Sequence, residues 1–172
     1  MEKKIAQKEG INYEDTFSPT TKWASIHTIF SLEDQNGWKV HQMDVKTDFL
    51  NGDMKYNNFM SQPKGFVVKG QDHKVCKLVK SLFDLKQASR ASYAKFTEHL
   101  LKLNFTHYEL DDASLFVNKV AKIMLYLVVY VDELLITGKN ENFIASMKKD
   151  LRKGFAMINL RYVHYCPCIE VI

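Results

Sequence analysis

Two apolar runs separated by a pair of acids form the most distinctive pattern along the chain. The first, residues 123–131, has nine consecutive apolar positions, most of them β-branched or aromatic. The second, residues 134–137, ends at Gly138. Short runs of this composition, bounded by turn residues, are typical of buried strands. We therefore predict a buried β-hairpin that carries Asp132 and Glu133 at its tip.

Adjacent carboxylates at the end of a buried hairpin need compensation. Asp132 and Glu133 repel each other, and both lose hydration when the strands around them are buried. A divalent cation would neutralise them, and magnesium in particular binds one or two carboxylates together with substrate phosphates. The alternative is an ordinary solvated turn, because turn positions generally favour Asp.

The rest of the pattern predicts short strands and three helices. The first helix starts at an N-cap on Thr20 or Thr21 and stops at Asn36-Gly37. A strand over residues 38–45 then delivers Asp44 near its far end, although an Asp closing a strand is also a common turn former. The other expected elements are a short strand at 58–60, an exposed hairpin pairing 67–68 with 75–78, a helix from 89 to 104, a strand at 115–117 and a helix beginning at 140.

This order of elements lacks the regular strand–helix–strand alternation of a parallel sheet. It predicts an α+β fold: a helix-backed, mostly antiparallel sheet with the acidic hairpin at its centre. The 172 residues are enough for a single domain, 1–172, which buries about 70% of its unfolded surface.

Charge divides the chain more sharply than its net value of +4 suggests. Residues 64–102 hold nine Lys or Arg against three acids, whereas residues 105–145 hold three against six. A basic region would suit a nucleic-acid backbone, with metal ions bridging that backbone to the acidic region. The alternative is an ordinary lysine-rich surface. The candidate nucleic-acid contacts are Lys74, Lys77, Lys80, Lys86 and Arg90.

Other classes of protein find little support. No apolar run approaches the roughly 20 residues of a membrane span, and residues 1–8 lack the apolar core of a signal peptide, so we expect an intracellular protein, cytoplasmic or nuclear, with no membrane partner. The three cysteines lack the spacing of a zinc site. There is no serine–histidine–aspartate constellation and no glycine-rich phosphate loop.

Four ordered motifs together resemble the reverse transcriptase domain of copia-type LTR retrotransposon Pol polyproteins. They are YEDTFSP at 13–19, QMDVKTDFLNG at 42–52, SLFDLKQ at 81–87 and YVDELL at 130–135. The resemblance extends from about Lys8 to Val171. It implies the fingers and palm of a right-handed polymerase, an RNA-directed DNA polymerase that extends a primer on an RNA or DNA template with deoxynucleoside triphosphates.

The resemblance also assigns roles to residues. It implies that Asp44, Asp132 and Glu133 are catalytic, and that Asp44, Asp132 and the backbone of Val45 bind two Mg²⁺ ions. It further implies that Thr47, Phe49 and Gln87 contact the nucleotide, with Phe49 as the aromatic gate against a ribose 2′-hydroxyl. We expect the carboxylates of Asp44 and Asp132 to lie within about 7 Å of each other.

The sequence departs from the family pattern at several positions. Glu133 replaces the second Asp of the family's Tyr-Val-Asp-Asp hairpin, and its extra methylene displaces the carboxylate by roughly 1 Å. Asp48 places a charge beside the gate, and Asp84, Ser89 and Ser92 replace a glycine, a proline and a tryptophan. These changes predict weak or undetectable primer extension by this partly degenerate domain.

The resemblance also predicts that the domain is truncated at both ends. The family's first basic strand would lie before Lys8, residues 169–171 look like the start of the primer-holding hairpin, and no thumb, RNase H or integrase segment follows. Two other interpretations stay open: a non-catalytic nucleic-acid-binding module, and an inert structural relic of a retrotransposon.

Overall fold

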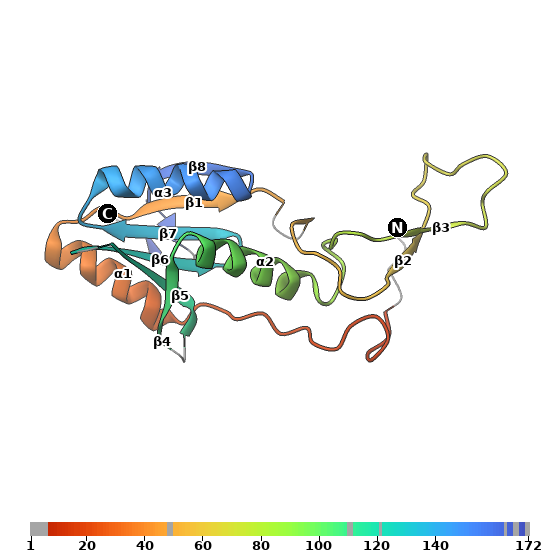
Figure 1. Ribbon diagram of the computed structural model, residues 1–172, viewed down its shortest axis with the longest axis horizontal. Helices are drawn as coiled ribbons and strands as arrows, with labels where there is room; N and C mark the ends of the chain where they lie inside the picture. The colour runs from red at the N-terminus through yellow and green to blue at the C-terminus, as the bar shows by residue number, and fades with distance from the viewer. Residues whose placement is uncertain are drawn as a thin grey trace. The chain divides into compact units, whose positions relative to one another are not determined.

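The computed structural model describes residues 7–47, 50–109, 112–120, 122–163, 165–166 and 169–170. The chain forms two compact units, each assembled from separate stretches of sequence (Figure 1). One contains Met1–Ser18 and Asp48–Lys95, and the other contains Pro19–Thr47 and Phe96–Ile172. The prediction of a single domain over 1–172 stays a prediction.

The second unit is built on an antiparallel sheet of six strands in the order β4-β5-β6-β7-β1-β8 (Figure 1). All the strand pairs within it are antiparallel, and the β6–β7 hairpin with its acids occupies the middle of the order. The α+β class and the mostly antiparallel sheet are therefore as predicted. The strands are β1 (His41–Val45), β4 (Phe105–Glu109), β5 (Asp112–Val120), β6 (Ile123–Tyr130), β7 (Glu133–Gly138) and β8 (Met157–Tyr162).

Three helices occur in the described part of the chain: α1 (Trp23–Asn36), α2 (Ala88–Lys102) and α3 (Glu141–Gly154). Helix α1 ends at Gly37, whose φ of 64° is the left-handed conformation that glycine adopts without steric cost. Its N-cap is Lys22, so the prediction of Thr20 or Thr21 as the N-cap is wrong. The Thr21 hydroxyl instead donates a hydrogen bond to the Val129 carbonyl. Helix α3 begins at Asn140, whose side chain accepts a hydrogen bond from the Phe143 amide.

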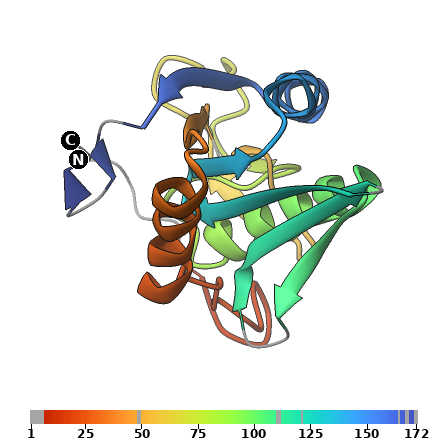
Figure 2. The same ribbon diagram turned by 90° about the vertical axis from the view of Figure 1, so that its left-hand side faces the viewer.

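The two faces of the sheet are covered by different helices (Figure 2). Directly opposed residues in antiparallel strands share a face. Leu115, Val128 and Leu135 form such a row, and Ile26 and Ile29 of α1 pack against it. The opposite face carries the row Phe116, Leu127, Ile136 and His41, and α3 reaches that face through Lys148.

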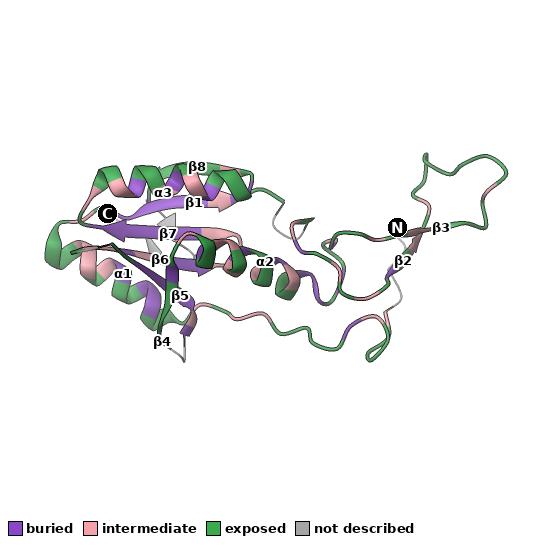
Figure 3. Ribbon diagram, viewed as in Figure 1, coloured by how far each residue is buried: buried purple, intermediate pink, exposed green. Residues whose placement is uncertain are grey.

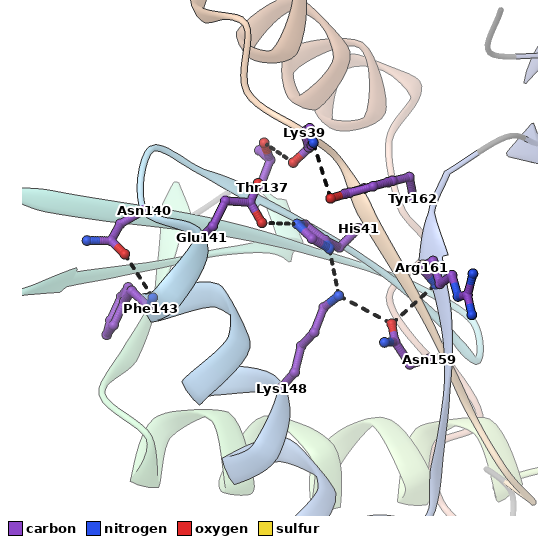
Figure 4. A network of polar contacts seen from close by, with 10 residues as sticks. All are labelled: Lys39, His41, Thr137, Asn140, Glu141, Phe143, Lys148, Asn159, Arg161 and Tyr162. Atoms are coloured by element: carbon purple, nitrogen blue, oxygen red, sulfur yellow. Dashed lines mark hydrogen bonds and ion pairs between the residues drawn. The ribbon is translucent and has the colours of Figure 1, made fainter.

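A polar network with a buried centre joins α3 to strands β1 and β8 of the sheet (Figure 4). The Lys148 ammonium lies 2.7 Å from His41 Nδ1 and donates a hydrogen bond to Asn159 Oδ1 at 3.2 Å. His41 Nε2 lies 3.0 Å from Glu141 Oε2. His41 and Lys148 are each only 8% exposed. Each of the four residues contacts another member, and we call the set the closed cluster: His41, Glu141, Lys148 and Asn159.

The first unit contains a small antiparallel pair, β2 (Phe59–Ser61) with β3 (Val75–Lys77). The predicted pairing of 67–68 with 75–78 is therefore wrong. The Gln62 side chain explains the difference: it accepts a hydrogen bond from the Val68 amide and donates to the carbonyls of Gln71 and Lys74, which organises residues 62–74 as a loop.

Sequence analysis also left two strands of the large sheet unpredicted, β4 and β8. A further short pair, β9 (Tyr165–Cys166) with β10 (Ile169–Glu170), includes residues 169 and 170 as its second strand, whereas the primer-holding hairpin was expected to start there; Val171 falls outside the described residues, and the primer-holding role stays a prediction. Burial is concentrated along β1, β5, β6 and β7 (Figure 3). Within the described residues, no helix has the length and apolar character needed to cross a membrane.

Candidate active site

Strand β1 runs beside β7 so that the acids predicted from sequence meet at one end of the pair. Asp44 lies directly opposite Glu133, and the Val45 amide donates a 2.8 Å hydrogen bond to the Asp132 carbonyl. The β1 strand and the hairpin tip are therefore joined at the position where both carry carboxylates. Sequence periodicity predicted each strand, and the structure supplies their register.

The hairpin turn itself is strained. Tyr130 pairs with Glu133, so Val131 and Asp132 form a two-residue connection. Val131 has a φ of 56°, which is unusual for any residue with a side chain and costly for a β-branched one. The side chain of Val131 is 60% exposed, so no burial of this residue offsets the strain. The turn orients Asp132 at the expense of local stability.

Burial and neighbouring charge raise the pKa values of Asp44 and Glu133. Burial raises the pKa of Asp44 above its ordinary value, and the charge of Asp132 raises it further, while Lys46 acts in the opposite sense. Burial also raises the pKa of Glu133, with smaller contributions from Asp132 and Asp44. Because the charge of Asp132 acts on both neighbours, the structure brings the three acids into one electrostatic group, which we call the acid cluster.

The acid cluster has an incomplete set of hydrogen bonds. The Gln42 side chain, a potential hydrogen-bond donor near the Glu133 carboxylate, partly offsets the rise in the pKa of Glu133. Glu133 Oε2, however, is buried and has no hydrogen-bond partner among the described residues. A buried oxygen without a partner costs free energy, so this group would be stabilised by a cation.

The donor set suits magnesium when substrate completes the coordination. Magnesium takes oxygen ligands and usually binds one or two carboxylates together with substrate phosphates. Asp44 offers one carboxylate on β1, and Asp132 offers another in the turn that joins β6 to β7. No three His, Cys, Asp or Glu side chains in the described ranges converge enough to hold an ion by themselves. The chain's own ligands therefore fit a site that is finished by a nucleotide.

The predicted substrate contacts fall in different parts of the chain. Thr47 follows β1 in the left-handed conformation, with φ 52°, and is exposed. Phe49, the predicted aromatic gate, and Asp48 lie outside the described residues. Gln87 belongs to the first unit and is 8% exposed; its amide accepts a hydrogen bond from Gln7 and donates one to the Asn12 carbonyl. The nucleotide contacts of all three stay predictions.

The five basic candidates are all exposed and belong to the first unit. Two have partners within the protein. Arg90 forms a 3.1 Å ion pair with Asp15 and donates to the Phe17 carbonyl, and the Lys86 ammonium lies 3.4 Å from the Tyr13 hydroxyl. Lys74, Lys77 and Lys80 project from the β3 strand and its flanks.

Gln42 is the residue of this site that sequence analysis missed. It lies within one of the recognised motifs but was given no role. Its position contained a usable signal, because a residue two places before Asp44 in a strand faces the same side of the sheet. The buried neighbours that make Gln42 informative come from β7, which is remote in sequence.

Comparison with known proteins agrees with the motifs. Residues 2–172 match the family model described as reverse transcriptase (RNA-dependent DNA polymerase). The chain belongs to this family. The copia-type resemblance inferred from four motifs is thereby confirmed over nearly the whole chain.

The relatives of this reverse transcriptase family member include plant retrotransposon polyproteins. It is 42% identical over 158 residues to the retrovirus-related Pol polyprotein from transposon TNT 1-94 of Nicotiana tabacum, covering 92% of this chain and 12% of that protein. It is 37% identical over 164 residues to the corresponding polyprotein from transposon RE1 of Arabidopsis thaliana, covering 95% of this chain and 11% of that protein. The chain thus spans about an eighth or less of these relatives. No solved structure matches the chain.

Proposed function

We propose that this chain is the reverse-transcriptase segment of a retrotransposon polyprotein, built for two-metal nucleotidyl transfer onto a primer 3′-hydroxyl. The observation that carries the proposal is the pairing of Asp44 with Glu133 beside the Val45–Asp132 hydrogen bond, inside a chain of the reverse transcriptase family. It rests on two acidic motifs that are 88 residues apart in sequence and meet on adjacent strands.

Each part of the acid cluster has a role in this proposal. Asp44 and Asp132 would hold Mg²⁺, together with the backbone carbonyl of Val45. Bound magnesium would activate the primer hydroxyl and neutralise the charge that develops on the triphosphate. The Val45–Asp132 hydrogen bond fixes β1 against the hairpin tip, which keeps the two ligands in register. Thr47 follows β1 directly, so nucleotide would bind past the end of this strand.

We infer that the rate of this reaction is low in the chain as it stands. Glu133 replaces an Asp of the family hairpin, and a misplacement of about 1 Å can reduce a positioned reaction by about 100-fold. The charge of Asp48 beside the gate acts in the same direction by repelling the triphosphate.

A nucleic-acid-binding module without catalysis is the second candidate. The exposed side chains of Lys74, Lys77 and Lys80 favour it, because contacts to phosphates need distributed charge and no exact constellation. Since Lys86 and Arg90 have partners inside the protein, we expect about three phosphate contacts and a log–log salt slope near −2.7 for duplex binding.

One pair of measurements separates the candidates. Primer extension on an RNA–DNA hybrid with Mg²⁺ should give weak synthesis that Asp44→Asn abolishes, while fluorescence anisotropy records binding of the same hybrid. Salt-sensitive binding with no synthesis at any enzyme concentration would favour the binding module. A folded sample that neither binds nor extends the hybrid would contradict both candidates and leave the structural relic.

A further inference from the structure

The side chain of Gln7 is held by three residues from two other stretches of the first unit. Its Nε2 donates hydrogen bonds to Asn58 Oδ1 at 3.1 Å and to Gln87 Oε1 at 2.7 Å. Its Oε1 accepts a 2.9 Å hydrogen bond from the Lys86 amide. A primary amide offers two N–H donors and two acceptor sites on its oxygen. Gln7 therefore uses both donors and one acceptor site, all within one compact unit.

The backbone fixes the orientation of the two amides that receive Gln7. The Asn12 carbonyl accepts hydrogen bonds from Asn58 Nδ2 and Gln87 Nε2, each at 3.1 Å. The Tyr56 carbonyl accepts a further one from Asn58 Nδ2 at 3.2 Å. A carbonyl oxygen is only an acceptor, so turning either side-chain amide by half a revolution would place oxygen against oxygen. Both side chains therefore present their oxygens to Gln7.

Burial makes this arrangement selective. Asn58 is 1% exposed and Gln87 is 8% exposed, so water does not readily replace a lost partner. A carboxylate in place of the Gln7 amide would bring its charge against two amide oxygens. An apolar side chain would leave both oxygens without a donor, which is costly for buried groups. The site therefore fits a primary carboxamide and disfavours its nearest isostere.

The segment that carries Gln7 also fixes Asn12, which orients both receiving amides. The Lys8 amide donates to Asn12 Oδ1 at 2.9 Å, and the Asn12 amide donates to the Lys8 carbonyl at 2.9 Å. Asn12 Nδ2 donates to the Asn57 carbonyl at 3.3 Å. Residues 7–12 thus form a closed turn that is attached to the unit by a glutamine at one end and an asparagine at the other.

We propose that Asn58, Gln87 and the Lys86 amide form a carboxamide-binding site, which we call the amide socket, and that the chain fills it with its own Gln7. Both polar atoms of the Gln87 side chain are committed there. Gln87 then anchors residues 7–12 and does not contact the incoming nucleotide, in contrast to the role that the family resemblance implies. Only this last part rests on the proposed function, because it concerns the nucleotide of the same reaction.

The first experiment follows hydrogen exchange of residues 8–13 in the intact chain by mass spectrometry. The amides of the turn lie in this range, so their exchange reports release of the segment. At pH 7 we expect exchange about tenfold faster in Gln7→Ala, which leaves two oxygens without a donor, and about 100-fold faster in Gln7→Glu, which adds a repelling charge. Gln35→Glu alters an exposed glutamine of α1, and this matched control should stay within about twofold.

The pH dependence separates hydrogen bonding from packing. A glutamate side chain regains one O–H donor when it is protonated, and its ordinary pKa is about 4.3. Each variant is referred to the unsubstituted chain at the same pH. At pH 4 the excess of Gln7→Glu over Gln7→Ala should fall from about tenfold to about threefold or less, a change that loss of packing would not produce. No excess at pH 7, or an excess that pH leaves unchanged, would overturn the amide socket.

Gln87→Met tests whether Gln87 anchors the segment, because methionine keeps the length of the side chain and removes both hydrogen-bonding groups. Exchange of residues 8–13 should rise about tenfold, and the double variant Gln7→Ala/Gln87→Met should exchange about as fast as the faster single variant. Multiplied effects in the double variant would show that the two side chains act independently and would overturn the anchoring role. If circular dichroism shows that Gln87→Met does not fold, the Gln7 variants decide the question, since Gln7 is only half-buried.

Nucleotide binding tests the part that rests on the proposed function. The probe is 2-aminopurine deoxyribonucleoside triphosphate with Mg²⁺ and a primer–template hybrid, titrated by fluorescence. Gln87→Met and Gln7→Ala should change nucleotide affinity by a similar factor of about threefold or less. Weakening of about tenfold or more that is confined to Gln87→Met would show a direct contact and overturn this part. An unsubstituted chain that binds no nucleotide would contradict the proposed function, whereas hydrogen exchange alone decides the amide socket.

Discussion

The closed cluster and the acid cluster use the same strand, β1, and are completed in different ways. In the closed cluster, Lys148 lies between His41 and Asn159, and Glu141 contacts the other side of the histidine ring (Figure 4). In the acid cluster, like charges face one another and Glu133 Oε2 has no partner among the described residues. One cluster satisfies its members from within the protein, and the other is left for a ligand to complete.

The difference teaches where to look for chemistry in this fold. Buried polar groups that are mutually bonded hold elements together, and in this case they join α3 to β1 and β8. Partly buried groups of one charge that gather beside a strained turn reduce stability and persist where binding requires them. The contrast predicts that substitutions in the two clusters change stability with opposite sign.

The largest effect should come from opening the closed cluster. Lys148→Ala removes the partner of both His41 Nδ1 and Asn159 Oδ1 and leaves a cavity, and we expect it to lower the free energy of unfolding by about 2 to 4 kcal/mol. Urea unfolding followed by circular dichroism measures the change. Lys149→Ala, an exposed neighbour on α3, is the matched control and should stay within about 0.5 kcal/mol. An equal effect of the two substitutions would contradict the closed cluster as a stabilising unit.

The two clusters should also respond to pH in opposite directions. Burial, then the charge of Lys148, lowers the pKa of His41 below 6.5; Lys39 adds to this lowering and Glu141 opposes it. Burial likewise lowers the pKa of Lys148 below 10.5, with Arg152 adding to the effect and Glu141 opposing it. The unfolded chain therefore binds protons more readily at these groups, so the contribution of Lys148 to stability falls as the pH drops below 10.5, and that of His41 falls as the pH drops below 6.5.

The acid cluster has the opposite sign. The pKa values of Asp44 and Glu133 are raised above 3.8 and 4.5, so the native state binds these protons more tightly than the unfolded state does. Its contribution to stability falls as the pH rises through this range.

Urea unfolding from pH 4 to 8 tests the closed cluster. The free energy of unfolding should no longer rise toward pH 6.5 in His41→Gln, and it should still rise in His27→Gln, which alters an exposed histidine of α1. An unchanged profile in His41→Gln would refute the assignment.

A smaller effect is expected from neutralising the acid cluster. Asp44→Asn removes repulsion with Asp132, and without metal it should raise the free energy of unfolding by up to about 1 kcal/mol. The same variant should lose the stabilisation that Mg²⁺ or Mn²⁺ gives to the unsubstituted chain, because only the native state presents both ligands. Differential scanning fluorimetry with and without metal measures both changes. Destabilisation without metal would show that Asp44 is a structural residue.

The smallest expected effect concerns the turn. Val131→Gly relieves a side chain with φ 56°, a strain of roughly 1 kcal/mol that is partly offset by the greater freedom of glycine when unfolded. We expect a net gain of about 0.5 kcal/mol in urea unfolding. Val129→Gly, in the adjoining strand with no such strain, should be strongly destabilising because Val129 is buried.

Sequence analysis predicted the local parts of this structure well. The hairpin of β6 and β7, strand β1 and the three helices were each signalled by periodicity within one stretch of chain. The local pattern failed where contacts between separate stretches decide the structure. The Gln62 side chain accepts the hydrogen bond of the Val68 amide, so the predicted hairpin does not form. Strand β8 is evident only from its pairing with β1.

The site shows the same division. Asp44, Asp132 and Glu133 were found because motifs name them, but the position of Gln42 beside them depends on the register of β1 with β7. Lys148 is instructive because it lies between Ile144 and Leu151 on the buried stripe of α3, where an apolar residue was to be expected. Only the fold shows that its ammonium group contacts His41 and Asn159.

The place of β1 in the sheet has a consequence for synthesis. Met43 pairs with Leu134 on one side and with Asn159 on the other. Leu134 follows Met43 by 91 positions, so the ribosome must add 91 residues after Met43 before its first partner is made. At 5 to 20 residues per second that wait lasts roughly 5 to 18 s, during which both edges of the strand lack partners. A charge within an unpaired strand discourages pairing with foreign strands. By this reasoning the charge of Asp44 would hinder such pairing while the chain is still being made, before any metal could bind.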